Sequence, residues 1–346
     1  MANRVSIEAT AGFRAKMEEL LVAVDERLEL DLKFECAGPE CGSPVLARHY
    51  SHWFGHVLLA CYEFDLLDEI AGQLRWLAGV MGRRGFGPGY FGRMLEAWSL
   101  AFTSELPQSE ATELTRPIDA WRHNLGALVE SAMPTSEPTP EVAAFVQLLL
   151  ARKRRAAAAG ALSRKTPVTR TADELVLPAL RHIGRLWEEA RISVADEHAV
   201  TEICRYVLYR LFDSVDPAAA SGHKALVACV PGEEHDIGAD LASEHLRLAG
   251  WSTFAAGRST PEEDIIAALR SYDPDVALFS VTMIANLPAT RHLVDKALAA
   301  KPGLGVVLGG KAAELARPRL SGPRVVVVSS LDEADRACQR LLDSHA

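Results

Sequence analysis

The sequence of 346 residues lacks the long apolar runs and the basic clusters that mark several large classes of protein. No apolar run approaches the roughly 20 residues needed to cross a bilayer, and the N-terminus lacks the charged-then-apolar order of a signal peptide. We therefore expect a cytoplasmic protein with no membrane partner. The net charge of −9 argues against nucleic acid as a partner, because phosphate contacts need clustered Lys and Arg.

Paired cysteines are also scarce. The six cysteines are scattered, and only Cys36 and Cys41 form a close pair, which is followed by His49, His52 and His56. Cysteine and histidine are zinc ligands, but no second cysteine pair completes a zinc pattern. The one basic run, residues 152–155, is flanked by apolar and Ala-rich helical sequence, so we interpret it as a helix surface. No winged-helix start precedes the helical segments that follow.

Two segments rich in residues that break helices and strands divide the chain into three predicted domains, a number that the chain length also fits. Residues 131–140 are rich in Pro, Ser and Thr, and residues 214–222 contain Asp-Pro and Ser-Gly pairs that precede an apolar run. The chain is thereby divided into a helical N-terminal domain, a four-helix bundle and an α/β domain. Their predicted limits are 1–130, 141–213 and 222–346.

The third domain shows short apolar runs that alternate with helical patterns. Runs buried on both faces with helical crossovers are typical of a parallel sheet covered by helices. The expected fold is multidomain α plus α/β, with a flavodoxin-like (Rossmann-type) sheet of five strands. The predicted strands are 224–230, 253–256, 276–281, 305–308 and 324–328.

Polar residues and glycines follow three of these strands. Because the carboxyl ends of parallel strands face a common crevice, we expect these residues to outline a site for one large ligand. They are Glu233, His235, Asp236 and Gly238 after the first strand, Ser280 and Thr282 after the third, and Gly309 and Gly310 after the fourth.

The role of His235 can be interpreted in two ways. Alone, it would be a helix cap or a solvent-facing side chain. Its place after a strand, with the Glu233 carboxylate two residues earlier, favours a metal ligand, because a ligating imidazole usually donates its other N–H to a carboxylate.

The pattern Glu-x-His-x-x-Gly, then Ser-x-Thr, then Gly-Gly resembles the cobalamin-binding domains of methionine synthase, corrinoid carrier proteins and cobalamin-dependent light sensors. The resemblance implies that His235 is the lower axial ligand of cobalt and displaces the nucleotide tail of the cofactor. Gly238, Gly309 and Gly310 would then leave room for that tail. The family usually has Asp where this chain has Glu233, whose side chain is one methylene longer.

A second pattern lies upstream, where Trp187 is followed after nine residues by Glu197 and His198. The intervening Ser193-x-x-Asp196 predicts a helix start, so Glu197 and His198 fall in its first turn. A core Trp and a solvated Glu–His pair is the plain reading. The spacing, however, resembles the signature of the adenosylcobalamin-dependent photoreceptors.

That resemblance implies that Trp187 packs on the upper ligand of cobalt and that Glu197 hydrogen-bonds its adenosine. In the DNA-binding members a His follows the Trp directly, whereas Glu188 holds that position here. We therefore do not expect a light state with two histidine ligands through that residue.

The N-terminal segment is helical in pattern and aromatic-rich, and it places His49, His52 and His56 on one helical face at i, i+3 and i+7. Such a face is either a solvated stripe or a set of ligand contacts. A helical domain fused to a cobalamin module resembles the photocobilins, which hold adenosylcobalamin together with biliverdin, a linear tetrapyrrole. The resemblance makes Arg48 and the three histidines candidates for biliverdin contacts.

The function expected from these resemblances is light sensing rather than catalysis, with output through a homodimer or a separate signalling partner. A corrinoid methyl carrier of a methyltransferase system is the alternative, since it shares His235 and the residues of the sheet edge. Trp187, Glu197 and the N-terminal segment favour the sensor. A corrinoid fold that has lost its cofactor, and an adenosylcobalamin mutase, fit less well, because His235 is intact and no substrate barrel is encoded.

Overall fold

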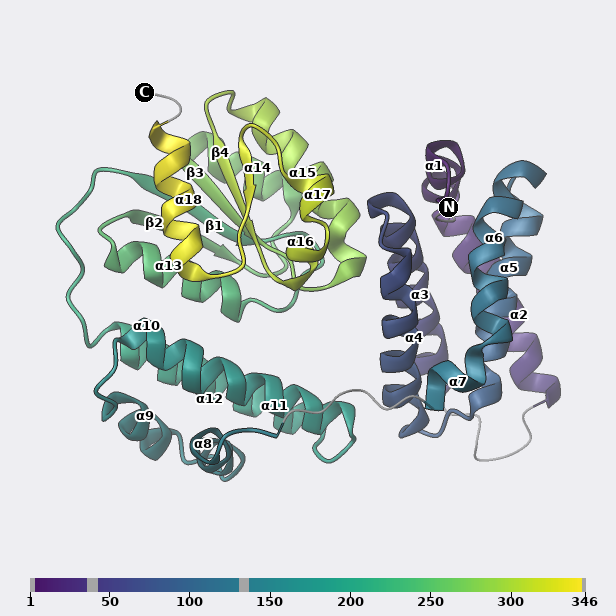
Figure 1. Cartoon of the computed structure of the whole chain (residues 1–346), viewed down its shortest axis with the longest axis horizontal. Helices are drawn as coiled ribbons and strands as arrows, with labels where there is room; N and C mark the ends of the chain where they lie inside the picture. The colour runs from purple at the N-terminus through teal and green to yellow at the C-terminus, as the bar shows by residue number, and fades with distance from the viewer. Residues whose placement is uncertain (1–3, 36–42, 131–136, 344–346) are drawn as a thin grey trace. The chain divides into compact units, whose positions relative to one another are not determined.

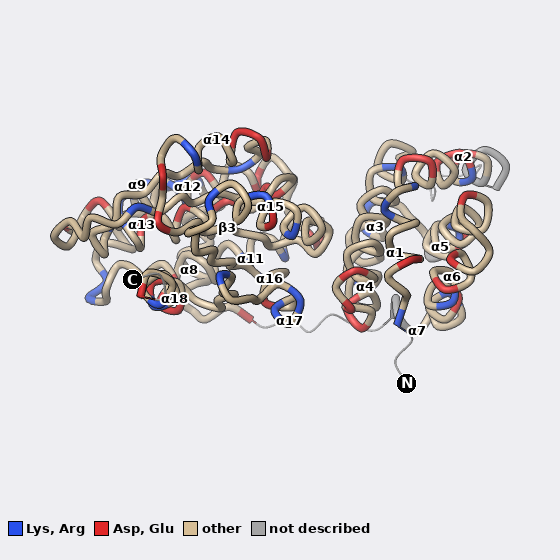
Figure 2. Tube along the Cα trace, turned by 90° about the horizontal axis from the view of Figure 1, so that it is seen from above, with Lys and Arg blue, Asp and Glu red and all other residues tan. Residues whose placement is uncertain are grey.

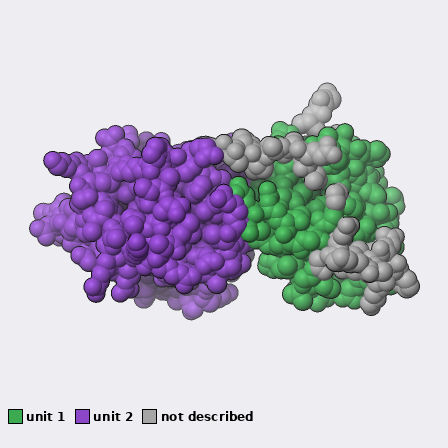
Figure 3. All heavy atoms as spheres, turned by 90° about the horizontal axis from the view of Figure 1, so that it is seen from below, with its two compact units in different colours: residues 1–135, 188–190 green, residues 136–187, 191–346 purple. Residues whose placement is uncertain are grey.

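The computed structural model describes residues 4–35, 43–130 and 137–343. The chain divides into two compact units, residues 1–135 with 188–190 and residues 136–187 with 191–346 (Figure 3). No helix in the described segments is long and apolar enough to span a bilayer. Cys36 and Cys41 lie outside the described residues, and the described part of the chain contains no cluster of three His, Cys, Asp or Glu that could hold a metal ion.

Residues 4–35 and 43–130 of the first unit fold into helices, as the sequence predicts (Figure 1). Their centre is aromatic: Trp98 is fully buried, and the ring of Phe13 packs edge-on against the rings of Trp98 and Phe102 at 5.9 and 4.7 Å. A side chain at Gly55 would meet the Trp98 ring, so glycine allows α3 and α5 to approach closely. The helices are α1 (Ile7–Ala15), α2 (Met17–Glu35), α3 (Pro44–Phe64), α4 (Leu67–Gly82), α5 (Pro88–Glu105), α6 (Gln108–His123) and α7 (Leu125–Glu130).

The second unit begins with a helical cap, residues 140–212, which has its own apolar core. Its helices are α8 (Pro140–Leu150), α9 (Arg154–Leu162), a continuous run of α10 (Val168–Thr171), the π-helical η1 (Ala172–Val176) and α11 (Leu177–Glu188), and then α12 (Val194–Phe212). The predicted start of α12 is confirmed. Ser193 and Asp196 form a capping box, in which each side chain bonds the backbone N–H of the other residue.

Charged residues of both signs are interspersed along the chain (Figure 2). The basic run 152–155 is exposed, but only Arg154 and Arg155 lie on a helix, α9, whereas Arg152 and Lys153 belong to the turn between α8 and α9. Arg152 pairs with Asp196 at 2.8 Å, and the Arg154 guanidinium lies over the Tyr206 ring. These contacts engage two of its four cations within the cap.

The predicted parallel sheet is confirmed, with the strand order β2-β1-β3-β4-β5 of the flavodoxin-like winding. The strands match the predicted segments to within one or two residues. They are β1 (Lys224–Cys229), β2 (Ser252–Gly257), β3 (Val276–Ser280), β4 (Gly305–Gly309) and β5 (Val325–Val327).

Helices cover both faces of the sheet (Figure 1). On one face, alternate residues of β1 (Ala225, Val227 and Cys229) pack with α13 and α18 in one apolar cluster. On the other face lie α14 and α15, which contact β1 and β4. The helices of this domain are α13 (Ile237–Leu248), α14 (Glu262–Tyr272), the 3-10 helix η2 (Ile284–Asn286), α15 (Leu287–Ala300), α16 (Lys311–Leu315), α17 (Arg317–Leu320) and α18 (Leu331–Asp343).

The winding places a topological switch point between β1 and β3. These strands are neighbours, but the chain leaves β1 through α13 on one face and leaves β3 through α15 on the other. In sheets of this kind, ligands bind at the carboxyl ends of the strands where the winding reverses. The loop that follows β1 carries Glu233 and His235, Ser280 is the last residue of β3, and Thr282 lies in the loop after β3.

Candidate cobalamin-binding site

Glu233 is the buried centre of the loop that follows β1. Its side chain is fully buried, and its Oε2 atom accepts hydrogen bonds from the backbone N–H groups of Thr282 and Met283 at 2.8 and 2.9 Å and from Asn286 Nδ2 at 3.1 Å. All three donors belong to the loop after β3 and its 3-10 turn. Glu233 thus ties the loop after β1 to the loop after β3 across the switch point.

The other carboxylate oxygen of Glu233 holds His235. Glu233 Oε1 lies 2.6 Å from His235 Nδ1 and 3.0 Å from the backbone N–H of His235. An ionised carboxylate only accepts hydrogen bonds, so it selects the imidazole form that carries a proton on Nδ1. In the neutral imidazole the lone pair is then on Nε2, and no described residue bonds that atom. The His235 side chain is 58% exposed, which leaves Nε2 accessible to a ligand.

The two pKa values shift in opposite directions. Burial alone would raise the pKa of Glu233, but the hydrogen bonds from His235 and from the backbone of Met283 and Thr282 lower it to about 2. The bond to Glu233 raises the pKa of His235 against the effect of its desolvation, and the Glu233, Glu197 and Asp236 carboxylates raise it further. Glu233 therefore stays ionised at neutral pH, and the imidazole is made more basic, as suits a metal ligand.

Two further carboxylates of the same loop are held from other directions. The Glu234 carboxylate accepts a hydrogen bond from Ser259 Oγ, in the loop that follows β2. Asp236, which the sequence analysis placed among the cofactor-binding residues, is buried and accepts a hydrogen bond from Arg205 of α12 at 2.8 Å. The structure therefore gives Asp236 a partner within the protein, and His235 sits in a loop that is braced on several sides.

The predicted Ser-x-Thr pair lies beside this loop. Ser280 is buried at the end of β3, and its carbonyl accepts the N–H of Val230 at 3.1 Å. Thr282 contacts the site through its backbone N–H, which bonds Glu233. The sequence pattern pointed to two hydroxyl groups, whereas the bond that the structure shows from Thr282 to Glu233 comes from its main chain.

Gly310 is required by the protein backbone itself. Its φ of +105° is rarely adopted by other residues, and a Cβ there would lie 2.2 Å from the carbonyl oxygen of Val281. The explanation of Gly310 as room for a nucleotide tail is thus not needed. Gly309 and Gly238 have only ordinary contacts, so their lack of a side chain leaves open surface beside Val328 and Ser280.

We expect Gly310→Ala to lower the free energy of unfolding by about 2 kcal/mol or more, because both the φ angle and the contact with Val281 would be strained. Chemical denaturation measures the effect. Gly303→Ala is the matched control, since its added Cβ meets no atom within 4 Å, and we expect it to change stability by less than about 1 kcal/mol. Equal stability of the two variants would contradict the backbone explanation.

The cap contributes Glu197 from the first turn of α12. Its Oε1 atom accepts a hydrogen bond from Thr201 Oγ1 at 2.8 Å, and its charge contributes to the raised pKa of His235. Trp187 is half-buried near the end of α11. His198 is 74% exposed, and its Nε2 lies 3.7 Å from Glu197 Oε2. The charge of Glu197 thus acts on the His235 imidazole, whereas the His198 side chain lies largely in solvent.

The histidine-rich face of the first unit is partly engaged by its own helices. Asp25 of α2 is buried and accepts hydrogen bonds from Arg48 Nε at 2.7 Å and from His52 Nε2 at 2.9 Å. The His49 ring packs edge-on against Tyr50. His49 and His56 are exposed. Two of the four candidate biliverdin contacts therefore have an acidic partner already.

Sequence reasoning missed two residues of the site. Asn286 bonds both Glu233 and the carbonyl of Gly232, and Arg205 bonds Asp236 from the cap. Asn286 could have been found as a further polar residue after the third predicted strand. No local pattern points to Arg205, because it lies 31 residues before its partner.

Two family models match the second unit. Both are described as B12 binding domain, and they cover residues 223–342 and residues 145–211. The first spans the sheet with His235, and the second spans most of the cap, including Trp187 and Glu197. The sequence prediction of a cobalamin-binding module is thereby confirmed.

Similar curated proteins include two HTH-type transcriptional repressors of Myxococcus xanthus. CarA is 32% identical over 138 residues, which are 40% of this chain and 46% of CarA, and CarH is 32% identical over 148 residues, which are 42% of this chain and 49% of CarH. Dimethylamine corrinoid protein 1 of Methanosarcina acetivorans is 23% identical over 135 residues, which are 38% of this chain and 63% of that protein.

This chain thus matches about half the length of the two repressors and less than two thirds of the corrinoid protein. The family models and these relatives agree on the same kind of domain. The chain therefore carries B12-binding domains at residues 145–211 and 223–342, and it is related over about two fifths of its length to the CarA and CarH repressors.

Proposed function

We propose that this protein is a light sensor that binds adenosylcobalamin, with His235 as the lower axial ligand of cobalt. The observation that carries the proposal is the pair formed by buried Glu233 and exposed His235 at the switch point of the sheet. Sensing is a further step, supported by Trp187 and Glu197 in the cap and by the relationship to CarA and CarH.

The residues present fit a corrinoid. A ligating imidazole needs an unprotonated nitrogen that faces the ligand and an N–H that is held from behind, and His235 has both. Gly238 and Gly309 have no side chain that would fill the surface near Ser280 and Val328. Cobalamin bound base-off and His-on is the form that this arrangement favours.

The upper side is the part that would respond to light. Adenosylcobalamin supplies a cobalt–carbon bond that visible light can break. Trp187 and Glu197 would pack on the adenosyl group in the dark, and loss of that group would remove their contacts. The cap would then favour a second position, which is how loss of a ligand shifts a two-state domain. The output would be a change in self-association or in the binding of a separate partner.

The experiment that tests this function compares dark and illuminated protein. The full chain is loaded with adenosylcobalamin in the dark, and its absorption spectrum and mass by light scattering are recorded before and after green light. We expect a light-driven change in the corrin spectrum together with a change in mass or shape. A spectrum that changes without any change in mass or in X-ray scattering would contradict the sensor.

Trp187→Ala should separate adenosyl recognition from corrin binding. An aromatic side chain packed on the adenosyl group would contribute enough for its loss to weaken adenosylcobalamin binding about tenfold, while hydroxocobalamin binding should stay within about twofold. Titration followed by absorbance measures both affinities. His292→Ala is the control, because His292 on α15 is 64% exposed and is none of the proposed site residues. Equal losses for both cofactors in Trp187→Ala would contradict an upper-face role for Trp187.

A corrinoid methyl carrier is the second candidate, and the relationship to dimethylamine corrinoid protein 1 favours it. It would use the same His235 and the same sheet edge. The same titration distinguishes the two functions. A methyl carrier should bind methylcobalamin at least as tightly as adenosylcobalamin, and Trp187→Ala should affect both forms equally.

Biliverdin as a second chromophore is a separate proposal about the first unit. Its support is the row of His49, His52 and His56 on one face of α3, next to Arg48. Since Asp25 bonds Arg48 and His52, a propionate would have to compete with that carboxylate. Asp25→Asn should then strengthen biliverdin binding. A protein that binds no biliverdin, before or after this change, would remove the second chromophore and leave the cobalamin sensor intact.

A further inference from the structure

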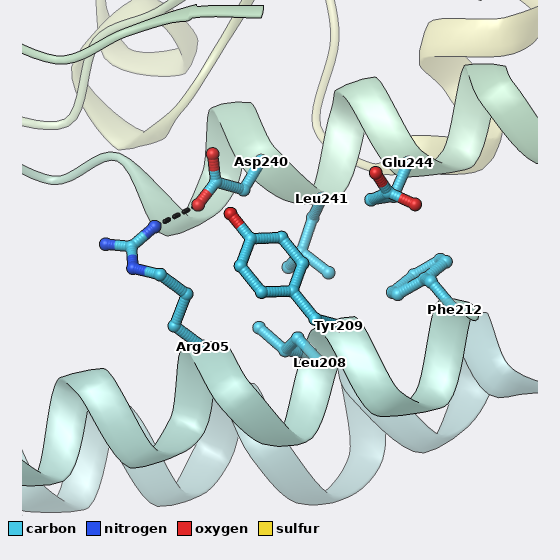
Figure 4. A pocket seen from close by; sticks show the side chains of 7 residues that line it. All are labelled: Arg205, Leu208, Tyr209, Phe212, Asp240, Leu241 and Glu244. Atoms are coloured by element: carbon cyan, nitrogen blue, oxygen red, sulfur yellow. Dashed lines mark hydrogen bonds and ion pairs between the residues drawn. The ribbon is translucent and has the colours of Figure 1, made fainter. Parts of the chain in front are cut away.

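Arg205 is a cap residue that bonds the histidine-bearing loop. It lies on α12 with only 16% of its side chain exposed. Its Nη2 atom donates to Asp236 Oδ1 at 2.8 Å, and its Nη1 atom bonds Asp240 on the first turn of α13 (Figure 4). Asp236 directly follows His235 in the sequence. One guanidinium therefore joins the cap to the loop that presents the candidate cobalt ligand.

The charges make this contact hard to replace. The side chains of Asp236 and Asp240 are 11% and 20% exposed, so two mostly buried carboxylates depend on one mostly buried cation. Removing one partner of a buried ion pair strongly destabilises the folded protein, because the remaining charge stays buried without compensation. Arg258 is a second cation near Asp236, at 3.8 Å, but it is half exposed and also lies near Glu234.

The contact continues along the two helices as an apolar one. Leu208, Tyr209 and Phe212 of α12 line a small pocket with Leu241 of α13 (Figure 4). The carbonyl of Phe212 accepts a hydrogen bond from Arg247 Nη2 at 3.1 Å. The C-terminal part of α12 is thus attached to α13, while its first turn carries Glu197, eight residues and about 12 Å before Arg205.

We propose that Arg205 is a positioning residue, which couples docking of the cap to placement of His235 as a ligand. This role rests on the cobalamin site proposed above. Asp236 is held by the cap through Arg205, and Glu233 is held by the loop after β3, so His235 lies between one anchor in the cap and one in the sheet. A shift of α12 is thereby transmitted to the imidazole through a single intervening peptide bond.

The experiment uses the full chain with Arg205→Gln, Arg205→Lys and the control Arg210→Gln. Arg210 is exposed on the same helix. Among the described residues, its guanidinium donates a hydrogen bond only to the Tyr206 hydroxyl, four residues earlier. Hydroxocobalamin is titrated in the dark, with the His-on absorption spectrum and the affinity as readouts. We expect Arg205→Gln to weaken binding by about tenfold or more and to reduce the His-on fraction, since coupling between sites is typically 5- to 150-fold.

Arg205→Lys should restore part of the effect. A lysine ammonium is a point charge and cannot bond both aspartates in the fixed geometry of a guanidinium. Arg210→Gln should behave as the wild type. A folded Arg205→Gln protein with wild-type affinity and an unchanged His-on spectrum would overturn the proposal. Should that variant fail to fold, Asp240→Asn keeps a hydrogen-bond acceptor and is expected to give the same change to a smaller extent.

A second readout needs no cofactor. Hydrogen exchange of residues 233–240 in the cofactor-free protein should rise in Arg205→Gln and not in Arg210→Gln, because the loop loses its anchor in the cap. Unchanged exchange would count against the proposal even if the wild type bound no corrinoid. Conversely, a wild type that binds hydroxocobalamin but shows no response to light would overturn the proposed sensor and leave the role of Arg205 standing.

Discussion

Replacing His235 with alanine is expected to weaken cobalamin binding by about 100-fold or more and to abolish the His-on absorption spectrum, because the variant has no imidazole nitrogen at the switch point. The buried Glu233 would also lose the imidazole partner of its Oε1 atom and keep only the backbone N–H of residue 235 there. Its three donors from the loop after β3 would remain, so the variant should still fold. Titration with hydroxocobalamin measures the affinity directly.

His292→Ala is the matched control for this substitution. His292 belongs to the same domain, lies on α15, and is 64% exposed, close to the 58% of His235. Its Nε2 atom has an acidic neighbour, Glu262, at 3.5 Å. We expect its loss to leave affinity and spectrum unchanged. Equal effects in the two variants, or normal binding by His235→Ala, would show that the cofactor is held elsewhere.

Glu233→Gln is expected to give the second largest effect, through the position of one proton. Glutamine can accept the N–H groups of Thr282 and Met283 with its carbonyl oxygen, but its NH2 group must then face His235 Nδ1. An amide donor there favours the neutral imidazole with its proton on Nε2. The nitrogen that should ligate cobalt would then have no free lone pair. We expect binding to weaken by about 10- to 100-fold.

The tautomer can be measured without cofactor, by nitrogen chemical shifts of labelled histidine. Wild-type His235 should show protonated Nδ1 and Glu233→Gln should show protonated Nε2 when the imidazole is neutral. Glu233→Asp keeps the carboxylate on a side chain that is one methylene shorter, and it should keep the wild-type tautomer. A Glu233→Gln protein with unchanged tautomer and unchanged affinity would contradict the role assigned to the carboxylate.

The sheet and its edge could be predicted from sequence because the signals are local. Each buried strand is a short apolar run, each run is followed within two residues by a polar residue or a glycine, and parallel winding brings those ends together. Ser193 and Asp196 likewise announce the start of α12 three residues apart. His235 and Glu233 are two residues apart, so their pairing was also within reach of a local pattern.

The parts that could not be predicted depend on distant residues or on the backbone. Arg205 and Asp236 are 31 residues apart and belong to two different predicted domains. No sequence pattern in either segment indicates that the two residues are partners. Thr282 serves Glu233 through its main chain, which no side-chain pattern can indicate. Gly310 was assigned to a ligand, whereas the approach of Val281 already requires it. The pairing of Arg48 and His52 with Asp25 could not be predicted either, because these residues are 23 and 27 positions from Asp25 in the sequence.

Axial ligation by His235 is most directly tested by electron paramagnetic resonance of the full chain loaded with cob(II)alamin. An axial nitrogen ligand splits the cobalt signal, and ¹⁴N gives a triplet where ¹⁵N gives a doublet. Protein that contains ¹⁵N-histidine should therefore show the doublet, and His235→Ala should lose it. A triplet that labelling leaves unchanged would mean that the nucleotide base of the cofactor remains on cobalt, and it would contradict His235 as the ligand.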